Sequence, residues 1–519
     1  MFIKVEPKDW MMHSVFLYFS DERIYPRGWP YMCAERKLET DVLIVGSGAV
    51  GVAAGIEARE AGASVILLEK EEILGGAAAV SGGGCAIVDT FLQREAGIED
   101  SHDLAFEDWI KAGQGKADEV WARFYIERSN DALFQWAKDR GVEWVGARQN
   151  EGNSVPRWHQ PKGGGGGLWN ALYRTAQDRG IDTWLTNTAA KELIVEDGRI
   201  IGVIAEDTTS GDTVEVLAKA VVMGSGGFNS NIDMVKEVRP DLRRHRILEG
   251  SGRGDTGDGH GMVEAVGGTT THMDDIWFYV FAIPDHKDER GRRGLVIRGV
   301  PDNIWVNAQG VRFHNEDLSG GGTGSVAVLA QEPAYCWSVM DSTMTDDVTV
   351  SDPQYYIPGA SVKDPEKVKA LIEESPHIKS GATLEALASE IGVPEDTFVE
   401  TVNHYNSGID QGLKEDPDFG RPLSNRKMIQ SPPYYALNFT PTARKNFGGV
   451  KTDLKCRAVD KHYEPIPGLF VAGELAGMAG GHINGKHGLE GTMLGPALFS
   501  GRVAGAWAAK DAGFGEGFK

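Results

Sequence analysis

Three glycines and one carboxylate in this 519-residue chain have the spacing of a dinucleotide-binding site. Gly46, Gly48 and Gly51 lie in the run GSGAVG, and Glu69 follows 18 residues after the last of them. In such a run the first glycine permits a tight turn, the second lets backbone N–H groups approach a pyrophosphate, and the third lets a helix pack closely on a strand. A carboxylate at the position of Glu69 accepts hydrogen bonds from both ribose hydroxyls. The combination predicts a bound adenine dinucleotide.

A βαβ unit must hold these residues, and the surrounding sequence predicts one. The apolar runs at 41–45 and 64–68 are typical of buried strands, and the alanine-rich stretch from 49 to about 61 is typical of a helix that Gly62 ends. Strands joined in this way lie parallel. We therefore expect an α/β domain with a Rossmann-like parallel sheet.

Later glycine clusters favour FAD over NAD as the dinucleotide. Glycines at 75–76 and 82–84 suggest a long cofactor whose far half continues along the backbone. A late strand at 468–474 returns to the same sheet and enters a glycine-rich loop, 477–491, and a helix from 493 to about 509. The N-terminus of that helix would stabilise the anion of a reduced flavin. The residues expected to contact FAD are Gly46, Gly48, Ala49, Val50, Gly51, Glu69, Lys70, Gly75, Gly76, Ser81, Gly82, Gly83, Gly84, Gly226, Gly227, Gly473, Glu474, Met493 and Leu494.

Outside these segments the chain changes character twice. Residues 1–39 contain many aromatic residues and prolines without clear periodicity, which is typical of a strap packed on the body of a protein. From about 272 to 433 the chain is more polar, with predicted helices at 365–374 and 395–407. A five-glycine run at 163–167, ahead of another predicted helix, either hinges a lid or lies near the cofactor.

Composition excludes several classes of partner. The 53 basic and 75 acidic residues give a net charge of −22, which argues against nucleic acid and anionic membranes as partners. The chain has no apolar run long enough to span a membrane and no signal-peptide pattern at its start. The four cysteines are far apart, and no Cys/His spacing matches a metal site. We therefore expect no metal, no disulfide framework and a reducing, cytoplasmic location.

Five segments resemble a known flavoprotein superfamily, which contains the fumarate reductase and succinate dehydrogenase flavoproteins together with the 3-ketosteroid dehydrogenases. The likeness covers about residues 38–519. The stretches SGGG at 81–84 and GTMLGP at 491–496 look closest to the ketosteroid dehydrogenase branch. The five segments are 45–51, 75–84, 221–228, 304–316 and 468–496.

The resemblance implies an FAD-binding domain that is split in sequence. Its first part would be residues 40–271 and its second part residues 434–519. An inserted α+β capping domain, residues 272–433, would hold substrate, with the active site between the two domains.

Two departures from the relatives concern catalysis. In the fumarate-reducing branch the segment like RFHNE at 312–316 is followed, four residues after the glutamate, by an arginine acid, and this chain has Gly320 there. The ketosteroid branch places a tyrosine base in the same region. The fumarate branch's His-His-Thr-Met-Gly-Gly motif corresponds to RKNFGG at 444–449. Neither catalytic set carries over complete, which argues against fumarate reduction.

His487 and Gly491 occupy the position of a carbonyl-binding pair. The ketosteroid branch has a tyrosine four residues before a glycine whose N–H binds the substrate carbonyl, and counting back from Gly495-Pro496 places this pair here. A histidine can also donate a hydrogen bond, so the pair would polarise the carbonyl and stabilise an enolate. The plain alternative for His487 is a hydrogen-bonded loop residue, and His482 and Lys486 are the nearest other candidates.

Tyr279 is a candidate for the base that takes the α-proton, and the sequence favours its alternative role as an aromatic residue packed in the cap core. Trp158 or His159, ahead of the five-glycine run, is expected to face the substrate, and His159 is thus a further catalytic candidate. Arg444 and Lys445 either hold a substrate carboxylate or form a surface pair.

These residues predict an FAD-dependent dehydrogenase of the CH–CH type. It would introduce a C=C bond next to a ketone in a cyclic, alicyclic or steroid-like small molecule, by α-proton abstraction and β-hydride transfer to flavin N5. One alternative is the reverse direction, an enone or enoate reductase fed by a separate electron donor. Another is a flavoprotein electron-transfer subunit. Only one dinucleotide fingerprint is present, so a separate NAD(P)H domain is not supported, and the sequence specifies neither the electron acceptor nor the oligomeric state.

Overall fold

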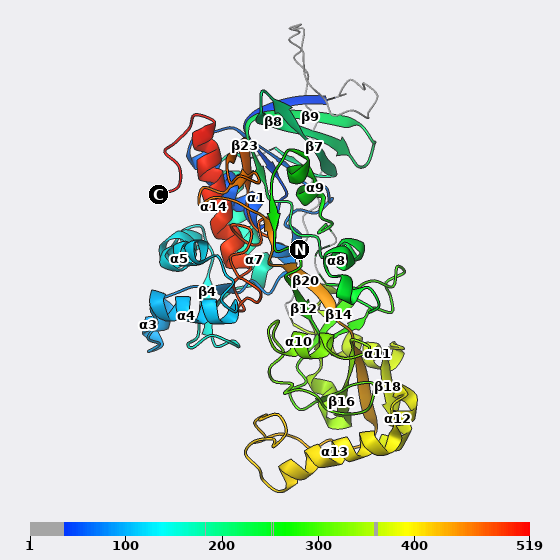
Figure 1. Ribbon diagram of the computed structural model, residues 1–519. Helices are drawn as coiled ribbons and strands as arrows, with labels where there is room; N and C mark the ends of the chain where they lie inside the picture. The colour runs from blue at the N-terminus through cyan, green and yellow to red at the C-terminus, as the bar shows by residue number, and fades with distance from the viewer. Residues whose placement is uncertain (1–35, 182, 251, 253, 358–361) are drawn as a thin grey trace.

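The main sheet of the fold has eight strands and lies in the upper part of Figure 1. The computed structural model describes residues 36–519 except 182, 251, 253 and 358–361, so the strap predicted at 1–39 lies outside the described residues as far as residue 35. The strand order is β22-β23-β9-β1-β2-β6, and β8 joins β9 to β7. These strands are β1 Arg36–Val45, β2 Val65–Leu68, β6 Trp184–Leu185, β7 Thr188–Glu196, β8 Arg199–Asp207, β9 Thr213–Met223, β22 Arg457–Val459 and β23 Pro465–Val471.

The predicted βαβ unit is confirmed. β1 pairs in parallel with β2, and helix α1 (Ala49–Glu60) connects them. The other edge of β1 pairs in parallel with β9, which in turn pairs in parallel with β23. All of β2 and the last four residues of β1 are buried, as expected for parallel strands covered on both faces. Because β1 and β23 come from opposite ends of the chain, this part of the fold is split in sequence as predicted.

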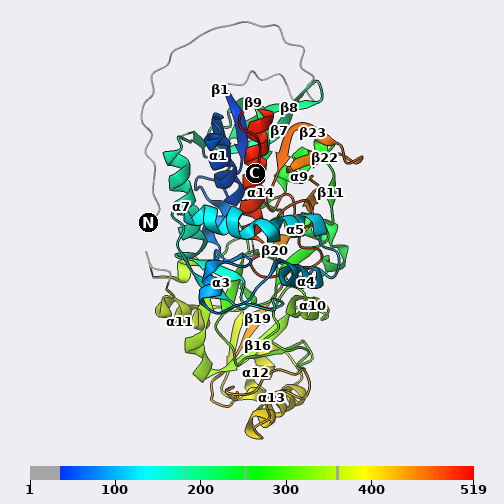
Figure 2. The same ribbon diagram turned by 90° about the vertical axis from the view of Figure 1, so that its left-hand side faces the viewer.

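Helix α14 (Leu494–Asp511) closes the sheet on the side of α1. The two helices approach so closely that a Cβ on Gly505 would collide with the carbonyl of Ala54. Phe499 of α14 also stacks edge-on against Phe124 of α5 (Glu119–Arg128), with ring centroids 5.0 Å apart. Figure 2 shows α5 crossing in front of the lower end of α14. Within the described ranges, no helix combines the length and the apolar character that crossing a bilayer requires.

A second, antiparallel sheet forms the capping domain in the lower part of Figure 1. The last of its strands begins at residue 434 and so lies beyond the predicted boundary at 433. Helix α11 matches its predicted range, and α13 extends three residues beyond its predicted end at 407. The elements are β15 Ile304–Val306, β16 Cys336–Asp341, β18 Ile378–Gly381, β19 Tyr434–Phe439, α11 Pro365–Glu374, α12 Leu384–Ile391 and α13 Glu395–Asp410.

The segment 304–316 supplies the core of the cap rather than a reactive group. Arg312 is paired with Glu316 at 2.9 Å and with Asp416 at 2.6 Å, and Arg421 is paired with Glu316 at 2.9 Å. All four side chains are buried, so each charge needs these partners. The network fixes the chain that leads to Gly320.

A small sheet connects the two domains. Its strands are β10 (Leu248–Glu249), β20 (Thr442–Asn446) and β12 (Ile276–Tyr279), and β12 and β20 lie between the main sheet and the cap in Figure 1. The antiparallel register between β12 and β20 shifts after Trp277, which leaves one additional residue on β20. Such a bulge lets neighbouring residues project to the same side of a strand.

The five-glycine run is part of a helix and not a hinge loop. Helix α7 (Gly164–Asp178) begins inside the run. A Cβ on Gly165 would collide with the carbonyl of Ala78 in α2 (Gly76–Val80). The glycines therefore let α7 pack directly on the backbone of α2, which belongs to a predicted cofactor segment.

Burial of His260 gives the fold a pH-dependent stability. Neither ring nitrogen of His260 has a hydrogen-bond partner within the described residues, and burial lowers its pKa to about 4. In the unfolded chain His260 has an ordinary pKa near 6.5 and binds a proton below that pH. In the folded chain it binds this proton only near pH 4. Stability therefore falls as the pH drops through this window, by roughly 3 kcal/mol.

We expect His260→Leu to remove this contribution. The variant should gain thermal stability relative to the parent protein on going from pH 7.5 to pH 4.5, because leucine has no proton to bind. Thermal midpoints of both proteins at the two pH values measure the effect. A parallel loss of stability in the two proteins would show that His260 binds a proton equally in both states.

Candidate functional site

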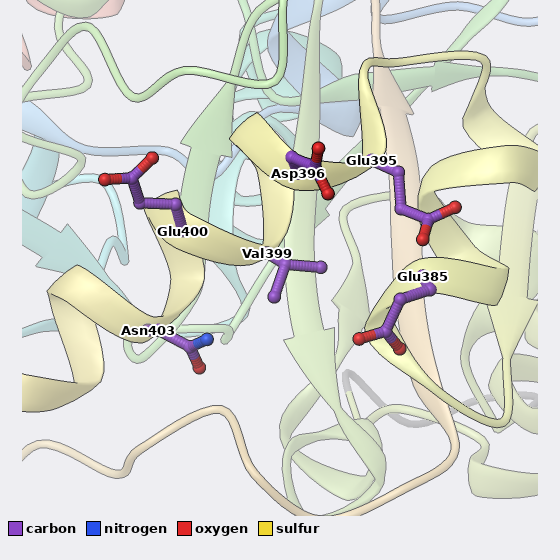
Figure 3. Close-up of a pocket in the computed structure, with 6 residues that line it drawn as sticks. All are labelled: Glu385, Glu395, Asp396, Val399, Glu400 and Asn403. Atoms are coloured by element: carbon purple, nitrogen blue, oxygen red, sulfur yellow. The ribbon is translucent and has the colours of Figure 1, made fainter.

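A surface hollow on α12 and α13 is not a good candidate for the catalytic site. Figure 3 shows four carboxylates around it, and it lies at the end of the cap that is farthest from the main sheet. Nothing else in its lining could carry out redox or proton chemistry. The lining residues are Glu385, Glu395, Asp396, Val399, Glu400 and Asn403.

The glycine run after β1 has the geometry that a diphosphate requires. Gly46 has φ +99°, and a Cβ on Gly51 would collide with the carbonyl of Gly46, so these two glycines are set by packing within the protein. Gly48 differs, since a Cβ there would meet only the carbonyl oxygen of Gly75, at 3.9 Å. Gly48 is also the N-cap of α1, where helix N–H groups attract anions. The open side of Gly48 therefore fits the close approach of a pyrophosphate.

Glu69 lies at the end of β2, where the ribose carboxylate was predicted. Its Oε2 accepts hydrogen bonds from the N–H (3.0 Å) and hydroxyl (2.6 Å) of Ser47, and its Oε1 accepts one from the N–H of Glu71 (3.0 Å). These bonds fix the carboxylate beside the glycine run. Lys70 instead donates to Thr256 and Asp258, each at 2.6 Å.

The segment from 75 to 84 runs along the backbone as expected for a long cofactor. Gly75, at φ +113°, turns the chain into α2. Gly84 lies directly beneath the indole of Trp158, with which any Cβ would overlap. Gly83 packs in the same way against the start of α7, with no room for a Cβ beside Gly164 and Gly165. Gly82 has more room, since a Cβ there would be 4.0 Å from Trp158.

Gly226 and Gly227 lie against two acidic side chains. A Cβ on Gly226 would be 2.5 Å from Oδ1 of Asp255, and one on Gly227 would be 2.7 Å from Oε1 of Glu474. Glu474 Oε1 accepts hydrogen bonds from the side chain of Asn229 and the N–H of Asn446. Burial and the charge of Asp255 raise the pKa of Glu474 to about 8, so this carboxyl carries a proton at neutral pH.

The late loop and α14 complete the cradle. Met493 caps α14, so the free N–H groups of the first helical turn, including that of Leu494, lie where the loop 477–491 ends. Gly473 packs on Val50 of α1, which joins the late loop to the first glycine run. The predicted cofactor residues of the first glycine run and of the late loop thus lie next to each other. Together they fit an FAD.

An aromatic ladder begins beside the late loop, since the ring of Trp277 lies 5.6 Å from that of Phe447, and Phe447 packs against Gly488. Trp277, Tyr279 and Phe281 alternate along β12 and its extension, and the rings of Tyr279 and Phe281 stack at 5.0 Å. Alternation along a strand places such residues on one face. Within the described residues, the Tyr279 hydroxyl makes no hydrogen bond, which leaves it able to donate or accept a proton.

Three cations surround the ring of Tyr279. The guanidinium carbons of Arg298 and Arg444 lie 5.3 and 5.4 Å from the ring centroid, and Nζ of Lys445 lies 5.5 Å from it. Arg444 and Lys445 reach the same ring although they are adjacent in sequence, because Lys445 pairs with Trp277 and Arg444 is the additional, unpaired residue of the bulge in β20. Within the described part of the chain, none of the three forms an ion pair with a carboxylate. Arg444 and Lys445 interact electrostatically with Glu474, whose carboxyl carries a proton at neutral pH, so positive charge is in local excess here although the chain has a net charge of −22.

His487 lies at the junction of the late loop with the cap. A Cβ on Gly322 would be 3.3 Å from its ring, and His487 is half-buried. Burial and the neighbouring Lys486 lower the pKa of His487, so its ring is neutral at pH 7 and can donate an N–H. Gly491, at φ +90°, packs against Trp158 and Ala86. Both residues belong to the predicted site, and their joint binding of a carbonyl stays a prediction.

His159 is not placed to act as a base. Its Nε2 lies 2.7 Å from the hydroxyl of Thr90, and its Nδ1 lies 2.8 Å from the carbonyl of Arg157. The ring is completely buried, and burial lowers its pKa to about 4. With both nitrogens occupied and the ring buried, His159 is held by the protein itself, and this geometry does not support the catalytic role predicted for it.

The alternative residue His482 is also committed to the protein. Its Nε2 lies 2.9 Å from Oδ2 of Asp275, and its ring stacks on His272 with centroids 3.7 Å apart. Since Asp275 begins the chain that enters β12, this pair fastens the late loop to the cap. His482 therefore has a structural role, in which it holds the late loop against the segment that leads into β12.

The glycine that replaces the relatives' acid has a neighbour that the sequence did not reveal. Glu151 accepts hydrogen bonds from the N–H of Gly320 (3.1 Å) and the hydroxyl of Thr323 (2.7 Å). A Cβ on Gly320 would be only 3.0 Å from this carboxylate. The contact joins the loop after β4 (Trp144–Arg148) to the cap, and no motif in the sequence signals it.

Arg148 and Arg298 were also missed. Arg148 stacks its guanidinium over Trp158, 3.8 Å from the ring centroid, and Arg298 lies 4.2 Å from the centroid of Phe281. Both arginines lie in strands whose sequences contain no binding or catalytic motif. Only the assembled structure brings them to the site.

The comparisons with known proteins agree with this geometry. One protein family, described as FAD binding domain, matches residues 41–494. A probable fumarate reductase of Shewanella frigidimarina is 31% identical over 477 residues, which cover 91% of this chain and 75% of that protein. A KsdD-like steroid dehydrogenase of Mycobacterium tuberculosis is 29% identical over 548 residues, covering 91% of this chain and 96% of that protein. Among solved structures, the open conformation of a flavocytochrome c3 fumarate reductase has a TM-score of 0.73 and 28% identity, covering 92% of this chain and 79% of that one.

Proposed function

Because the chain belongs to the FAD binding domain family and is an FAD-dependent oxidoreductase, we propose that it reduces the C=C bond of an unsaturated carboxylate. The observation that carries the proposal is the group of three cations around Tyr279, none of which is paired with a carboxylate within the described residues. A neutral ketone would leave this charge uncompensated. A substrate carboxylate compensates it with charge-assisted hydrogen bonds.

Each residue of the proposed site has a defined task. Arg444 and Lys445 hold the carboxylate and stabilise the negative charge that builds up on it as the double bond is reduced. Tyr279 donates the proton that the carbon next to the carboxylate requires, and the same three cations stabilise the charge that develops on its oxygen. The aromatic ladder holds the unsaturated part of the substrate and excludes water. Bound FAD supplies the hydride chemistry.

The reverse reaction on a ketone is the second candidate. It is favoured by the neutral ring of His487, which can donate to a carbonyl oxygen, and by Gly320, which offers no acid for a reductase. The relatives include both a probable fumarate reductase and a steroid dehydrogenase. In this candidate Tyr279 takes the α-proton instead of giving it.

A matched pair of substrates separates the two candidates. Cinnamate and benzalacetone carry the same phenyl and C=C groups but end in a carboxylate and a neutral ketone, respectively. Anaerobic, dithionite-reduced enzyme should be reoxidised by cinnamate at least about tenfold more efficiently than by benzalacetone, because only cinnamate uses the cations. Stopped-flow absorbance of the flavin measures both rates. A preference for benzalacetone, with bleaching of oxidised enzyme by a saturated cyclic ketone, would establish the dehydrogenase instead.

A further inference from the structure

Arg148 and Arg298 lie at the same site but on a different part of it from Arg444 and Lys445. Arg148 ends β4, where it pairs across the strands with Trp158 of β5 (Trp158–Pro161). Arg298 ends β14 (Gly294–Arg298) in the cap. The two arginines therefore come from opposite sides of the boundary between the FAD-binding domain and the cap.

The guanidinium of Arg148 is held in place by stacking. It lies 3.8 Å from the centroid of the Trp158 ring, and that ring rests on Gly84 and Gly491, both predicted site residues. A stacked, planar guanidinium keeps its edge free for two parallel hydrogen bonds to a carboxylate. Its orientation is thus fixed before a ligand binds.

The two arginines also affect each other. Partial burial lowers the pKa of Arg148, Glu490 opposes this shift, and the positive charge of Arg298 adds to it. Within the described residues neither arginine forms an ion pair, whereas Arg157 and Arg312, which are buried, each have two carboxylate partners. Glu490 offsets part of the repulsion between the two arginines without forming an ion pair with Arg148 within the described residues, and a bound anion would offset the rest.

We propose that Arg148 and Arg298 form a second anion-binding subsite, which takes a carboxylate at the end of the substrate remote from the reacting bond. The inference rests on the proposed function, since Arg444 and Lys445 hold the first carboxylate. Arg298 contacts the rings of both Tyr279 and Phe281, whereas Arg444 contacts Tyr279 and Lys445 contacts Tyr279 and Trp277, so Arg298 and the Arg444–Lys445 pair lie toward opposite ends of the aromatic ladder. The subsite therefore selects a dianion whose two acidic groups are joined by a flat, unsaturated or aromatic spacer.

Binding of two probes to the oxidised, FAD-loaded enzyme tests the subsite without turnover. Cinnamate carries one carboxylate, and 4-carboxycinnamate carries a second at the far end of the same ring. Perturbation of the flavin absorbance gives both dissociation constants. At low salt we expect the dianion to bind about tenfold more tightly, and at about 0.3 M salt the ratio should shrink because both arginines are exposed.

Substitutions assign the preference to the two arginines. Arg148→Gln should bring the two dissociation constants within about twofold, with cinnamate binding unchanged. Arg298→Gln should also remove the preference, and because Arg298 lies 5.3 Å from the Tyr279 ring centroid, it should weaken cinnamate binding as well. Arg148→Lys should keep part of the preference, because it retains the charge but loses the planar stack. Arg292→Gln, an exposed arginine of the cap away from the site, is the matched control and should keep the full preference.

The possible failures are distinguishable. No preference for the dianion in the parent protein, or the same preference in both glutamine variants, would overturn the subsite. If the preference is lost in the variants but reduced enzyme does not react with cinnamate, the subsite stands and the proposed reaction is wrong. If cinnamate is reduced but the dianion binds no more tightly, the reaction stands and the subsite is wrong.

Discussion

Tyr279→Phe should lower turnover by roughly 10²- to 10⁴-fold, the range for loss of a positioned proton donor. The variant loses only the hydroxyl, which has no hydrogen-bond partner within the described residues, so no group in the protein is left unpaired. Phenylalanine keeps the ring that stacks on Phe281 at 5.0 Å and that three cations surround. FAD content, thermal midpoint and the dissociation constant of cinnamate should therefore stay unchanged. Stopped-flow reoxidation and flavin absorbance measure these quantities on the same sample.

A second tyrosine of the cap provides the control for this prediction. Tyr335 is partly buried beside Trp337, with ring centroids 6.2 Å apart, and is not among the site residues. Tyr335→Phe should leave turnover unchanged. A Tyr279→Phe enzyme that turns over within about threefold of the parent rate would exclude Tyr279 as the proton donor. Lys445, which contacts the same ring, would then be the next candidate.

Gly48→Val should produce a folded protein without its cofactor. A Cβ at this position meets only the carbonyl oxygen of Gly75 within 4 Å, so the protein has room for the first atom of the new side chain. The same side chain would occupy the space through which a pyrophosphate approaches the N-terminus of α1. We expect FAD to bind at least about hundredfold more weakly, which corresponds to about 2.7 kcal/mol. Fluorescence titration of apoprotein with FAD measures the loss.

The thermal midpoint distinguishes loss of the cofactor from loss of the fold. The apo form of Gly48→Val should melt with the parent apoprotein, and only the increase on adding FAD should disappear. Gly261→Ala, at a glycine of α9 (Asp258–Ala265) with open space around it, should keep that increase. If Gly48→Val still binds FAD with parent affinity, the pyrophosphate does not lie beside Gly48.

Local sequence patterns were sufficient to predict the βαβ unit. The glycine run and the two apolar strands specify it because each depends on residues within about thirty positions of one another. The late return of the chain to the same sheet was also predicted, since the 468–474 segment has the apolar pattern of a buried strand. Pairing of β23 with β9 confirms it. The boundary at 433 was placed by composition, and the pairing of β19 depends on partners that composition does not reveal.

The arrangement of the catalytic groups was much less predictable. Arg444 and Lys445 stand next to each other, and on a regular strand they would project to opposite faces. A one-residue shift in the pairing of β20 with β12 brings both to Tyr279, and the sequence of β20 alone contains no signal for it. Arg148 and Arg298 are separated by 150 positions, and their electrostatic interaction arises only in the folded protein, across the boundary between the FAD-binding domain and the cap.

The inward orientation of His159 has a simple physical origin. Trp158 and His159 are adjacent on β5, so only one of them can face the site. Trp158 takes that face, beneath Arg148, and His159 turns inward to Thr90. The sequence alone does not indicate whether Trp158 or His159 points inward, because both side chains combine an apolar ring with a polar N–H group.

The position of β23 also constrains how the polypeptide matures. The sheet beneath the dinucleotide is completed by residues 465–471, which leave the ribosome only after the whole cap has been synthesised. A nascent chain that still lacks this strand leaves residues 221–223 of β9 unpaired on that edge, while the first part of β9 is already paired with β8. Because unpaired strand edges invite association with other chains, this short segment is exposed to such association until translation of the chain is almost complete.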